Sequence, residues 1–199
     1  MTVSTDQQIK QSLDSVTSNP KSGVPGLVFA SIDKNGQMLS QQASGRLGLD
    51  SDEPMTLDTV FWIASCTKMI AGIACMQLVE QGKLDLDDAQ SLYRLCPELK
   101  EKKVIVDAGN GKKGKEGLKL VEKEKEITLR MLLDHTAGFG YTFFNEKLRD
   151  WGRPIGYDEF TGDEKDILEM PLVNQPGSRW EYGVCCGRNA HCARRSVLT

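Results

Sequence analysis

One stretch, residues 59–79, most constrains how this chain of 199 residues can fold. A short apolar run that ends at Ala64 leads into Ser65, and from there apolar side chains recur at helical spacing as far as Val79. Gly82 is the expected C-cap, because glycine adopts the left-handed conformation that ends many helices. The pattern therefore predicts a strand that passes directly into an apolar helix at Ser65.

Shorter elements flank this stretch and mix helices with antiparallel strands. Before it we expect an amphipathic helix over 5–18 and strands at 27–32 and 37–44, joined by a tight turn at Asn35-Gly36, since hairpin turns need positive φ. After it we expect a helix around Leu92 and Leu95 that Pro97 interrupts, strands at 103–107 and 117–122, a helix capped by Thr128 that runs to Leu133, and a helix around 163–170.

Composition narrows the class of protein. Apolar residues make up 39% of the chain and charged residues 27%, which is the balance of a globular protein. The net charge of -3 disfavours nucleic-acid binding, which usually needs a clearly basic surface. No apolar run approaches the ~20 residues of a bilayer-spanning helix, and no secretory signal is visible at the N-terminus. We therefore expect a cytoplasmic protein with neither a nucleic-acid nor a membrane partner.

The six cysteines are expected to be thiols, because no secretion signal accompanies them. Cys66, Cys75 and Cys96 lie in apolar segments, where free cysteine packs as a small hydrophobe. The other three fall within residues 185–199, a tail with no acidic residue and no periodicity. Such a break in composition indicates a different reading frame or a retained intron, and the alternative is a short disordered basic tail.

Ser65 and Lys68 form a Ser-x-x-Lys match whose side chains share one helix face. A serine becomes a good nucleophile when a base takes its proton, and a lysine can be that base once burial and nearby cations lower its pKa. The helix N-terminus adds N–H groups that can stabilise an oxyanion. Two further matches, at 18–21 and 31–34, contain a proline or straddle a turn. The alternative for Ser65 is an N-cap serine beside a surface lysine.

The remaining motifs are better explained by structure than by chemistry. The segment from Gly109 to Lys115 imitates a phosphate-binding loop, but Glu116 stands where a magnesium-binding hydroxyl belongs, so we expect a solvated hairpin turn. His135 is expected to be a hydrogen-bonded structural residue. Tyr182 follows a Pro-Gly turn and indicates nothing by itself. The cysteines and histidine of the tail lack the paired spacing of zinc sites, so neither a metal nor a cofactor is expected.

Five segments, in their order along the chain, resemble the serine β-lactamase-like superfamily. They are GVPG at 23–26, FWIASCTK at 61–68, LVEQGKL at 78–84, ITLRMLLDHTAG at 127–138 and PGSRWEY at 176–182. The branch most similar to them contains the class C β-lactamases, the family VIII esterases and the transesterases. Within it, the fungal secondary-metabolite acyltransferases look especially similar.

The resemblance implies an acyl-serine mechanism. Ser65 would be the nucleophile, Lys68 its partner base, and Tyr182 the tyrosine that shares proton transfer and protonates the leaving group. The backbone N–H of Ser65 would be one oxyanion donor. The implied function is hydrolysis or acyl transfer on a small-molecule ester, thioester or amide. The alternatives are a β-lactam hydrolase or D-alanyl peptidase, and a non-catalytic fragment or binding protein.

The implied fold is α+β, with helices flanking an antiparallel sheet and a mostly helical insertion. The family's Lys-Thr-Gly-like strand, which carries the second oxyanion donor, is absent, and the similarity stops at Val184, where the composition changes. We therefore expect a truncated, weakly active or inactive form that lacks the C-terminal half of the sheet. Its expected parts are an N-terminal part of the α/β domain over 1–62, the nucleophile helix with a mostly helical region over 63–184, and a disordered non-family tail over 185–199.

Overall fold

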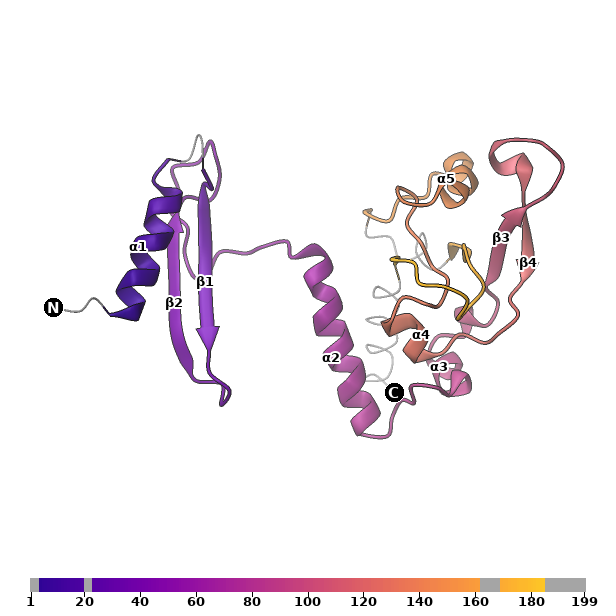
Figure 1. Ribbon diagram of the computed structural model, residues 1–199, viewed down its shortest axis with the longest axis horizontal. Helices are drawn as coiled ribbons and strands as arrows, with labels where there is room; N and C mark the ends of the chain where they lie inside the picture. The colour runs from indigo at the N-terminus through magenta and orange to yellow at the C-terminus, as the bar shows by residue number, and fades with distance from the viewer. Residues whose placement is uncertain (1–3, 20–22, 162–168, 185–199) are drawn as a thin grey trace. The chain divides into compact units, whose positions relative to one another are not determined.

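The computed structural model describes three stretches of the chain: 4–19, 23–161 and 169–184. The chain divides into two compact units, Met1–Trp62 and Ile63–Thr199, called here the N-terminal and C-terminal units (Figure 1). The tail over 185–199 and most of the helix expected around 163–170 lie outside the described residues. Among the described residues, no helix has both the length and the apolar character needed to cross a bilayer.

The N-terminal unit consists of a helix and a two-stranded hairpin (Figure 1). Helix α1 (Thr5–Thr17) begins at Ser4, whose side chain accepts a hydrogen bond from the backbone of Gln7 while the Gln7 side chain caps the backbone of Ser4. Strands β1 (Gly26–Ile32) and β2 (Met38–Gly45) pair antiparallel. The helix and both strands expected in this region are confirmed.

The turn between β1 and β2 differs from the expected one. Within it, only Gly36 has a positive φ, of 80°, so Asn35 does not take the left-handed conformation. The Asp33 carboxylate instead accepts hydrogen bonds from the backbone N–H groups of Asn35 and Gln37, each at 2.8 Å. A side chain that braces its own turn in this way replaces the second positive φ of the expected turn.

Polar side chains join α1 to the hairpin. The buried hydroxyls of Thr17 and Ser44 lie 2.7 Å apart. Near the start of the helix, the Asp6 carboxylate accepts hydrogen bonds from Ser40 at 2.5 Å and from Gln42 at 2.8 Å. Most apolar side chains of this hairpin are exposed, so hydrogen bonds rather than an apolar core connect the helix to the strands.

The strand expected directly before Ser65 is absent. Residues 59–63 have no regular structure, and Val60 and Trp62 are 93% and 85% exposed. A strand requires a hydrogen-bonded neighbour, and no strand pairs with 59–63 in the described part of the chain. The chain passes instead through a single 3₁₀ turn, η1 (Ala64–Cys66), into helix α2 (Thr67–Glu80).

Helix α2 ends as the sequence predicts. The backbone N–H of Gly82 bonds to the carbonyl of Val79, and Gly82 has a φ of 70°. One side of the helix is buried and contains Cys75 and Leu78. The exposed apolar side chains of α2 are Met69, Ile70, Ile73 and Met76.

The rest of the C-terminal unit is built from short elements around a second hairpin. They are α3 (Ala89–Leu95), η2 (Pro97–Leu99), β3 (Lys103–Asp107), η3 (Gly114–Gly117), β4 (Leu118–Glu122), α4 (Leu129–Leu133), α5 (Glu146–Gly152) and η4 (Arg153–Ile155). Strands β3 and β4 pair antiparallel, so the Gly/Lys-rich segment is confirmed as a hairpin loop. Helix α5 was not predicted, although Asn145 caps it through the N–H of Leu148 at 3.1 Å.

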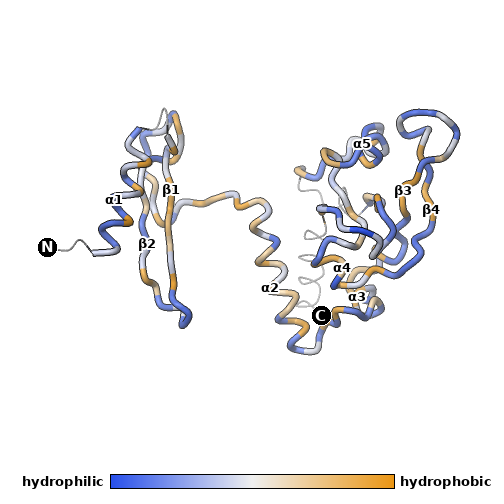
Figure 2. Tube along the Cα trace, viewed as in Figure 1, coloured by the Kyte–Doolittle hydropathy of each residue, from blue (hydrophilic) through white to orange (hydrophobic). Residues whose placement is uncertain are grey.

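The C-terminal unit contains the apolar core. Figure 2 shows apolar positions on β3 and β4, and β3 supplies two buried side chains, Val104 and Ile105. The largest fully buried side chains are Phe139, Leu92, Leu99, Ile105, Ile127, Leu129, Leu132, Leu148, Met170 and Leu172. The short helices and β3 contribute side chains to this core, which gives the segments that follow them fixed positions.

The expectation of thiols throughout is wrong at one position. Cys66 and Cys75 are thiols, but Cys96 is disulfide-bonded. Disulfide pairing depends on which cysteine the fold brings within reach. The positions of the cysteines along the sequence do not determine this pairing.

Candidate active site

Ser65 lies at the entry to α2, within the 3₁₀ turn η1. The residue before it, Ala64, has a φ of 43°, a left-handed conformation that non-glycine residues seldom adopt. Such backbone strain costs about 1–3 kcal/mol and occurs often at functional sites. The N–H groups of Cys66 and Thr67 bond to the carbonyls of Ile63 and Ala64, so the candidate oxyanion donor next to the hydroxyl is the N–H of Ser65 itself.

The structure brings the three predicted site residues together. Lys68 lies one turn beyond Ser65, and its Nζ donates a hydrogen bond to Ser65 Oγ at 3.2 Å. Tyr182 lies 117 residues further along the chain, and its hydroxyl donates to the same oxygen at 2.8 Å. Lys68 Nζ is also 4.9 Å from the centre of the Tyr182 ring. The three groups form one hydrogen-bonded cluster within the C-terminal unit.

Tyr141 is a fourth member of this cluster, and the sequence analysis missed it. Lys68 Nζ donates to the Tyr141 hydroxyl at 3.2 Å, and the rings of Tyr141 and Tyr182 are 5.7 Å apart. Tyr141 follows the segment Gly138-Phe139-Gly140, in which no residue pattern distinguishes it from a surface tyrosine. Only the folded chain places its hydroxyl beside Lys68.

The pKa of Lys68 is shifted in the direction opposite to the expected one. Partial burial of the ammonium acts to lower this pKa, but hydrogen bonds with Tyr141 and Tyr182 raise it more, and the pKa ends above its ordinary value. The expectation of a lowered pKa assumed an enclosed lysine beside other cations. Lys68 instead faces two phenol oxygens, so it is an ammonium at neutral pH.

His135 holds the segment that contains Tyr182. Its carbonyl accepts a hydrogen bond from the N–H of Glu181 at 3.0 Å, and its Nδ1 accepts one from Gly183 at 3.5 Å. Burial, followed by the positive charge of Lys68, lowers the pKa of His135, with a smaller opposing effect of Asp134. A neutral imidazole keeps Nδ1 available as an acceptor. The prediction of a hydrogen-bonded structural residue is confirmed.

Glu181 and Gly183, the neighbours of Tyr182, also tie this segment down. The Glu181 carboxylate accepts hydrogen bonds from the side chains of Asn145 at 2.8 Å and Asn174 at 2.6 Å. A Cβ at Gly183 would lie 2.4 Å from the carbonyl oxygen of Phe139, so no larger residue fits there. Tyr182 is thus fixed from both sides by groups of the C-terminal unit.

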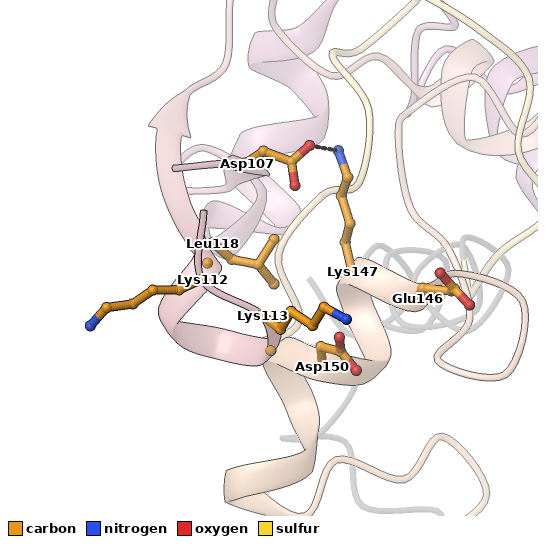
Figure 3. A pocket seen from close by; sticks show the side chains of 9 residues that line it. Asp107, Lys112, Lys113, Leu118, Glu146, Lys147 and Asp150 are labelled. Atoms are coloured by element: carbon orange, nitrogen blue, oxygen red, sulfur yellow. Dashed lines mark ion pairs between the residues drawn. The ribbon is translucent and has the colours of Figure 1, made fainter. Parts of the chain in front are cut away.

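The Gly/Lys-rich hairpin loop forms one wall of a separate cavity of about 420 Å³ against α5. In Figure 3, Lys147 of α5 points toward Asp107 at the end of β3, and the two form an ion pair of 2.9 Å. Lys112 points away from this cavity and pairs with Glu116 at 3.0 Å. Acidic and basic groups alternate around the cavity, so the loop lacks the converging positive charge of a phosphate site. No group of three or more potential metal ligands occurs among the described residues.

A family model described as beta-lactamase matches residues 5–185. The chain belongs to the β-lactamase family. Its relatives include monacolin J acid methylbutanoyltransferase of Aspergillus terreus, which is 33% identical over 171 residues, covering 80% of this chain and 39% of the relative. Lovastatin esterase of Penicillium rubens is 33% identical over 167 residues, covering 80% and 40%. The family thus includes acyltransferases and esterases.

Solved structures agree with this assignment. Unliganded simvastatin synthase from Aspergillus terreus superposes with a TM-score of 0.74 at 26% identity, over 98% of this chain and 50% of that one. The expected β-lactamase/transpeptidase-like fold is confirmed. The chain spans about two fifths of the length of the curated relatives that it matches.

Proposed function

We propose that the C-terminal unit carries the catalytic centre of a serine ester hydrolase or acyltransferase that works through an acyl-Ser65 intermediate. The observation that carries this proposal is the pair of hydrogen bonds on Ser65 Oγ, from Tyr182 at 2.8 Å and from Lys68 at 3.2 Å. Two titratable groups on one hydroxyl are the arrangement that activates a serine nucleophile.

In the proposed acylation step, Ser65 Oγ forms a bond to the ester carbonyl carbon. The Ser65 proton passes to the neutral form of Lys68, which relays a proton to Tyr182, and the carbonyl oxygen accepts a hydrogen bond from the Ser65 N–H. The carbon–oxygen bond to the alcohol then breaks, and Tyr182 donates the proton to the departing alcohol. Water or a second alcohol attacks the acyl group by the reverse sequence, which yields hydrolysis or transfer.

Because the pKa of Lys68 is raised, its ammonium form has a second role in the proposed mechanism. As an ammonium, Lys68 stabilises the negative charge that develops on Ser65 Oγ and on the oxygens of Tyr141 and Tyr182. Its neutral form becomes available as a base only in the alkaline range. Tyr141 in this scheme is a positioning residue, since its hydroxyl bonds to Lys68 and not to Ser65.

The proposed substrates are small-molecule esters or thioesters. The related lovastatin esterase and monacolin J acid methylbutanoyltransferase carry names that place an ester bond at the centre of their reactions. These relatives support acyl chemistry on esters more directly than β-lactam hydrolysis. Nitrocefin cleavage by the 199-residue chain that is lost in Ser65→Ala would instead favour the β-lactam alternative.

The test is covalent labelling of the 199-residue chain by a fluorophosphonate, read by mass spectrometry of the tryptic peptides. We expect the label on Ser65 and none after Ser65→Ala. Ser31→Ala is the matched control, because Ser31 and Lys34 form a second Ser-x-x-Lys match in the N-terminal unit. Labelling that survives Ser65→Ala, or no labelling of the folded chain at all, would refute the proposal.

A further inference from the structure

Glu159 holds the loop that contains Tyr141, although the proposed mechanism gives this carboxylate no part. It accepts two hydrogen bonds from Thr142, one from the backbone N–H at 2.5 Å and one from the hydroxyl at 2.9 Å. Thr142 directly follows Tyr141, whose hydroxyl accepts a hydrogen bond from Lys68 Nζ at 3.2 Å. Only Thr142 and Tyr141 therefore separate the Glu159 carboxylate from the Lys68 ammonium.

A stack of aromatic rings joins the same two segments a second time. The Tyr141 ring stacks on Phe143 at 4.8 Å between ring centres, and Phe143 stacks on Phe160, the neighbour of Glu159, at 5.7 Å. Phe143 and Phe160 are 53% and 63% exposed, so the stack buries little apolar surface. Hydrogen bonds to a carboxylate are short and directional, so the two bonds on Thr142 set the position of the loop more narrowly than the rings do.

The segment that carries Glu159 is itself anchored to α5. The N–H of Tyr157 bonds to the carbonyl of Gly152 at 3.3 Å, and a Cβ at Gly152 would lie 2.9 Å from the Tyr157 ring. The ring therefore lies directly on the last residue of α5, a helix whose Leu148 is fully buried in the core. Through this segment, the core of the C-terminal unit fixes where Glu159 meets Thr142.

Tyr141 affects the reaction through Lys68. The ammonium is faced by Ser65, Tyr141, Tyr182 and His135. Partial burial acts to lower the pKa of Lys68, and the hydrogen bond with Tyr141 is the largest of the effects that raise it. If Tyr141 leaves its position, the pKa of Lys68 should fall, and the ammonium should lose one of the bonds that hold it beside Ser65.

We propose that Glu159 is a positioning residue of the acylation reaction, which acts through Thr142 to hold the Tyr141 hydroxyl against Lys68. The inference rests on the proposed function, because it concerns the same hydrogen-bonded cluster. While Thr142 is held, Tyr141 keeps the Lys68 ammonium beside Ser65 Oγ, where it stabilises the charge that develops on that oxygen. Without Glu159, the loop that carries Tyr141 loses its polar attachment to α5.

The experiment measures the rate of fluorophosphonate labelling of Ser65 in the 199-residue chain as a function of pH. Glu159→Ala should lower the rate at high pH by about two- to tenfold, the effect of losing one hydrogen bond, and should move the rising limb of the profile to lower pH. Tyr141→Phe should produce the same two changes, and adding Glu159→Ala to it should have no further effect. A variant that is merely less stable would lose labelled protein without moving the profile.

Three further variants separate the two hydrogen bonds from other effects. Glu159→Gln keeps both bonds, because its amide accepts from the Thr142 N–H and donates to the Thr142 hydroxyl, so it should largely restore the wild-type profile. Thr142→Val removes only the hydroxyl bond and should move the profile less, in the same direction. Glu146→Ala removes an exposed carboxylate of α5, 3.6 Å from Arg149, and is the control that should change nothing.

Each outcome decides for or against the inference. A wild-type profile for both Glu159→Ala and Thr142→Val would overturn it, as would a Glu159→Ala effect that persists in the Tyr141→Phe background. Equal shifts in Glu159→Gln and Glu159→Ala would also overturn it. A chain that is labelled at Ser65 without these changes refutes this inference alone, whereas a folded chain that is never labelled refutes the proposed function.

Discussion

The two units of this protein each contain an antiparallel hairpin, but only one hairpin has an apolar core beside it. In the hairpin of β1 and β2, Ile32 and Leu39 are 62% and 64% exposed, whereas in that of β3 and β4, Val104 and Ile105 are almost fully buried. The second hairpin also gains a third segment, because the N–H of Ile105 bonds to the carbonyl of Leu172 at 2.8 Å. Both units thus contain paired strands, but only the hairpin of the C-terminal unit buries apolar side chains in a core.

This difference explains where the candidate site is located. The core of the C-terminal unit fixes the turn after α4, and His135 in this turn holds the segment that contains Tyr182. In the N-terminal unit, the Ser-x-x-Lys match of Ser31 and Lys34 ends in an exposed turn. The same four-residue pattern therefore has a different meaning in the two units, because catalysis needs groups that are held in place.

The largest expected effect is on the rate of Ser65 labelling, and it distinguishes Lys68 from Lys34, the lysines of the two Ser-x-x-Lys matches. Lys68→Ala and Tyr182→Phe should each slow fluorophosphonate labelling of Ser65 by ~10²–10⁴, because each removes part of one proton-transfer unit. The double variant should be little slower than either single one, since groups that act as a unit are not additive. Lys34→Ala should leave the rate unchanged. Strictly multiplicative losses for Lys68 and Tyr182 would show that they act independently.

A pair of phenylalanines tests the contrast in burial. Phe139→Ala removes a fully buried ring and should cost about 3–5 kcal/mol in the free energy of unfolding of the C-terminal unit. Phe29→Ala, on the partly exposed strand β1, should cost about 1 kcal/mol in the N-terminal unit. Hydrogen exchange in urea, resolved by peptide, measures both. Equal costs would mean that Phe29 is covered in solution and that the two hairpins do not differ as described.

The polar contacts of the N-terminal unit should have a smaller but measurable effect. Ser44→Ala removes the hydroxyl that bonds to Thr17 at 2.7 Å and donates to Asp14 at 2.6 Å. We expect a loss of about 1 kcal/mol, seen as faster hydrogen exchange in α1. Ser15→Ala, at an exposed position of the same helix, should change stability by less than about 0.5 kcal/mol. Equal effects of the two variants would contradict a role of Ser44 in holding the helix.

Lowering the pH should destabilise the two units at different pH values. The pKa of Asp6 is lowered by hydrogen bonds from Ser40 and Gln42, so its stabilising contribution is present above about pH 4 and is lost below that as the carboxylate gains a proton. The pKa of His135 is lowered by burial and by Lys68, so its contribution is present above about pH 6.5 and is lost as the pH falls toward its folded-state pKa.

Hydrogen exchange, corrected for its intrinsic pH dependence, checks this order. Between about pH 7 and pH 5, peptides around Tyr182 should become less protected, while α1 should hold until about pH 4. His135→Asn should remove the earlier change, because asparagine does not titrate and tolerates the φ of 63° at this position. If both regions loosen together, the two titrations do not govern them.

The sequence by itself determined the elements that have strong local start and stop signals, such as helix caps and turn residues. The Thr128 cap of α4, the Gly82 end of α2 and the hairpin around the Gly/Lys loop all follow from residues within a few positions of one another. The one-turn spacing of Ser65 and Lys68 is equally local. Helix α5 carries a comparable signal in its Asn145 cap, but the surrounding glycines and aromatics concealed it.

Only the tertiary structure decided what surrounds Ser65. The family resemblance assigned Tyr182 a role, but its 2.8 Å contact with Ser65 joins residues that are 117 positions apart in the sequence. Tyr141 has no distinguishing neighbours in the sequence, and the direction of the Lys68 pKa shift depends on the two phenols that the fold brings near it. The missing strand at 59–63 has the same cause, since a strand exists only where another lies beside it. Contacts between distant segments are set by which apolar surfaces are buried together, and this information is spread over the whole chain.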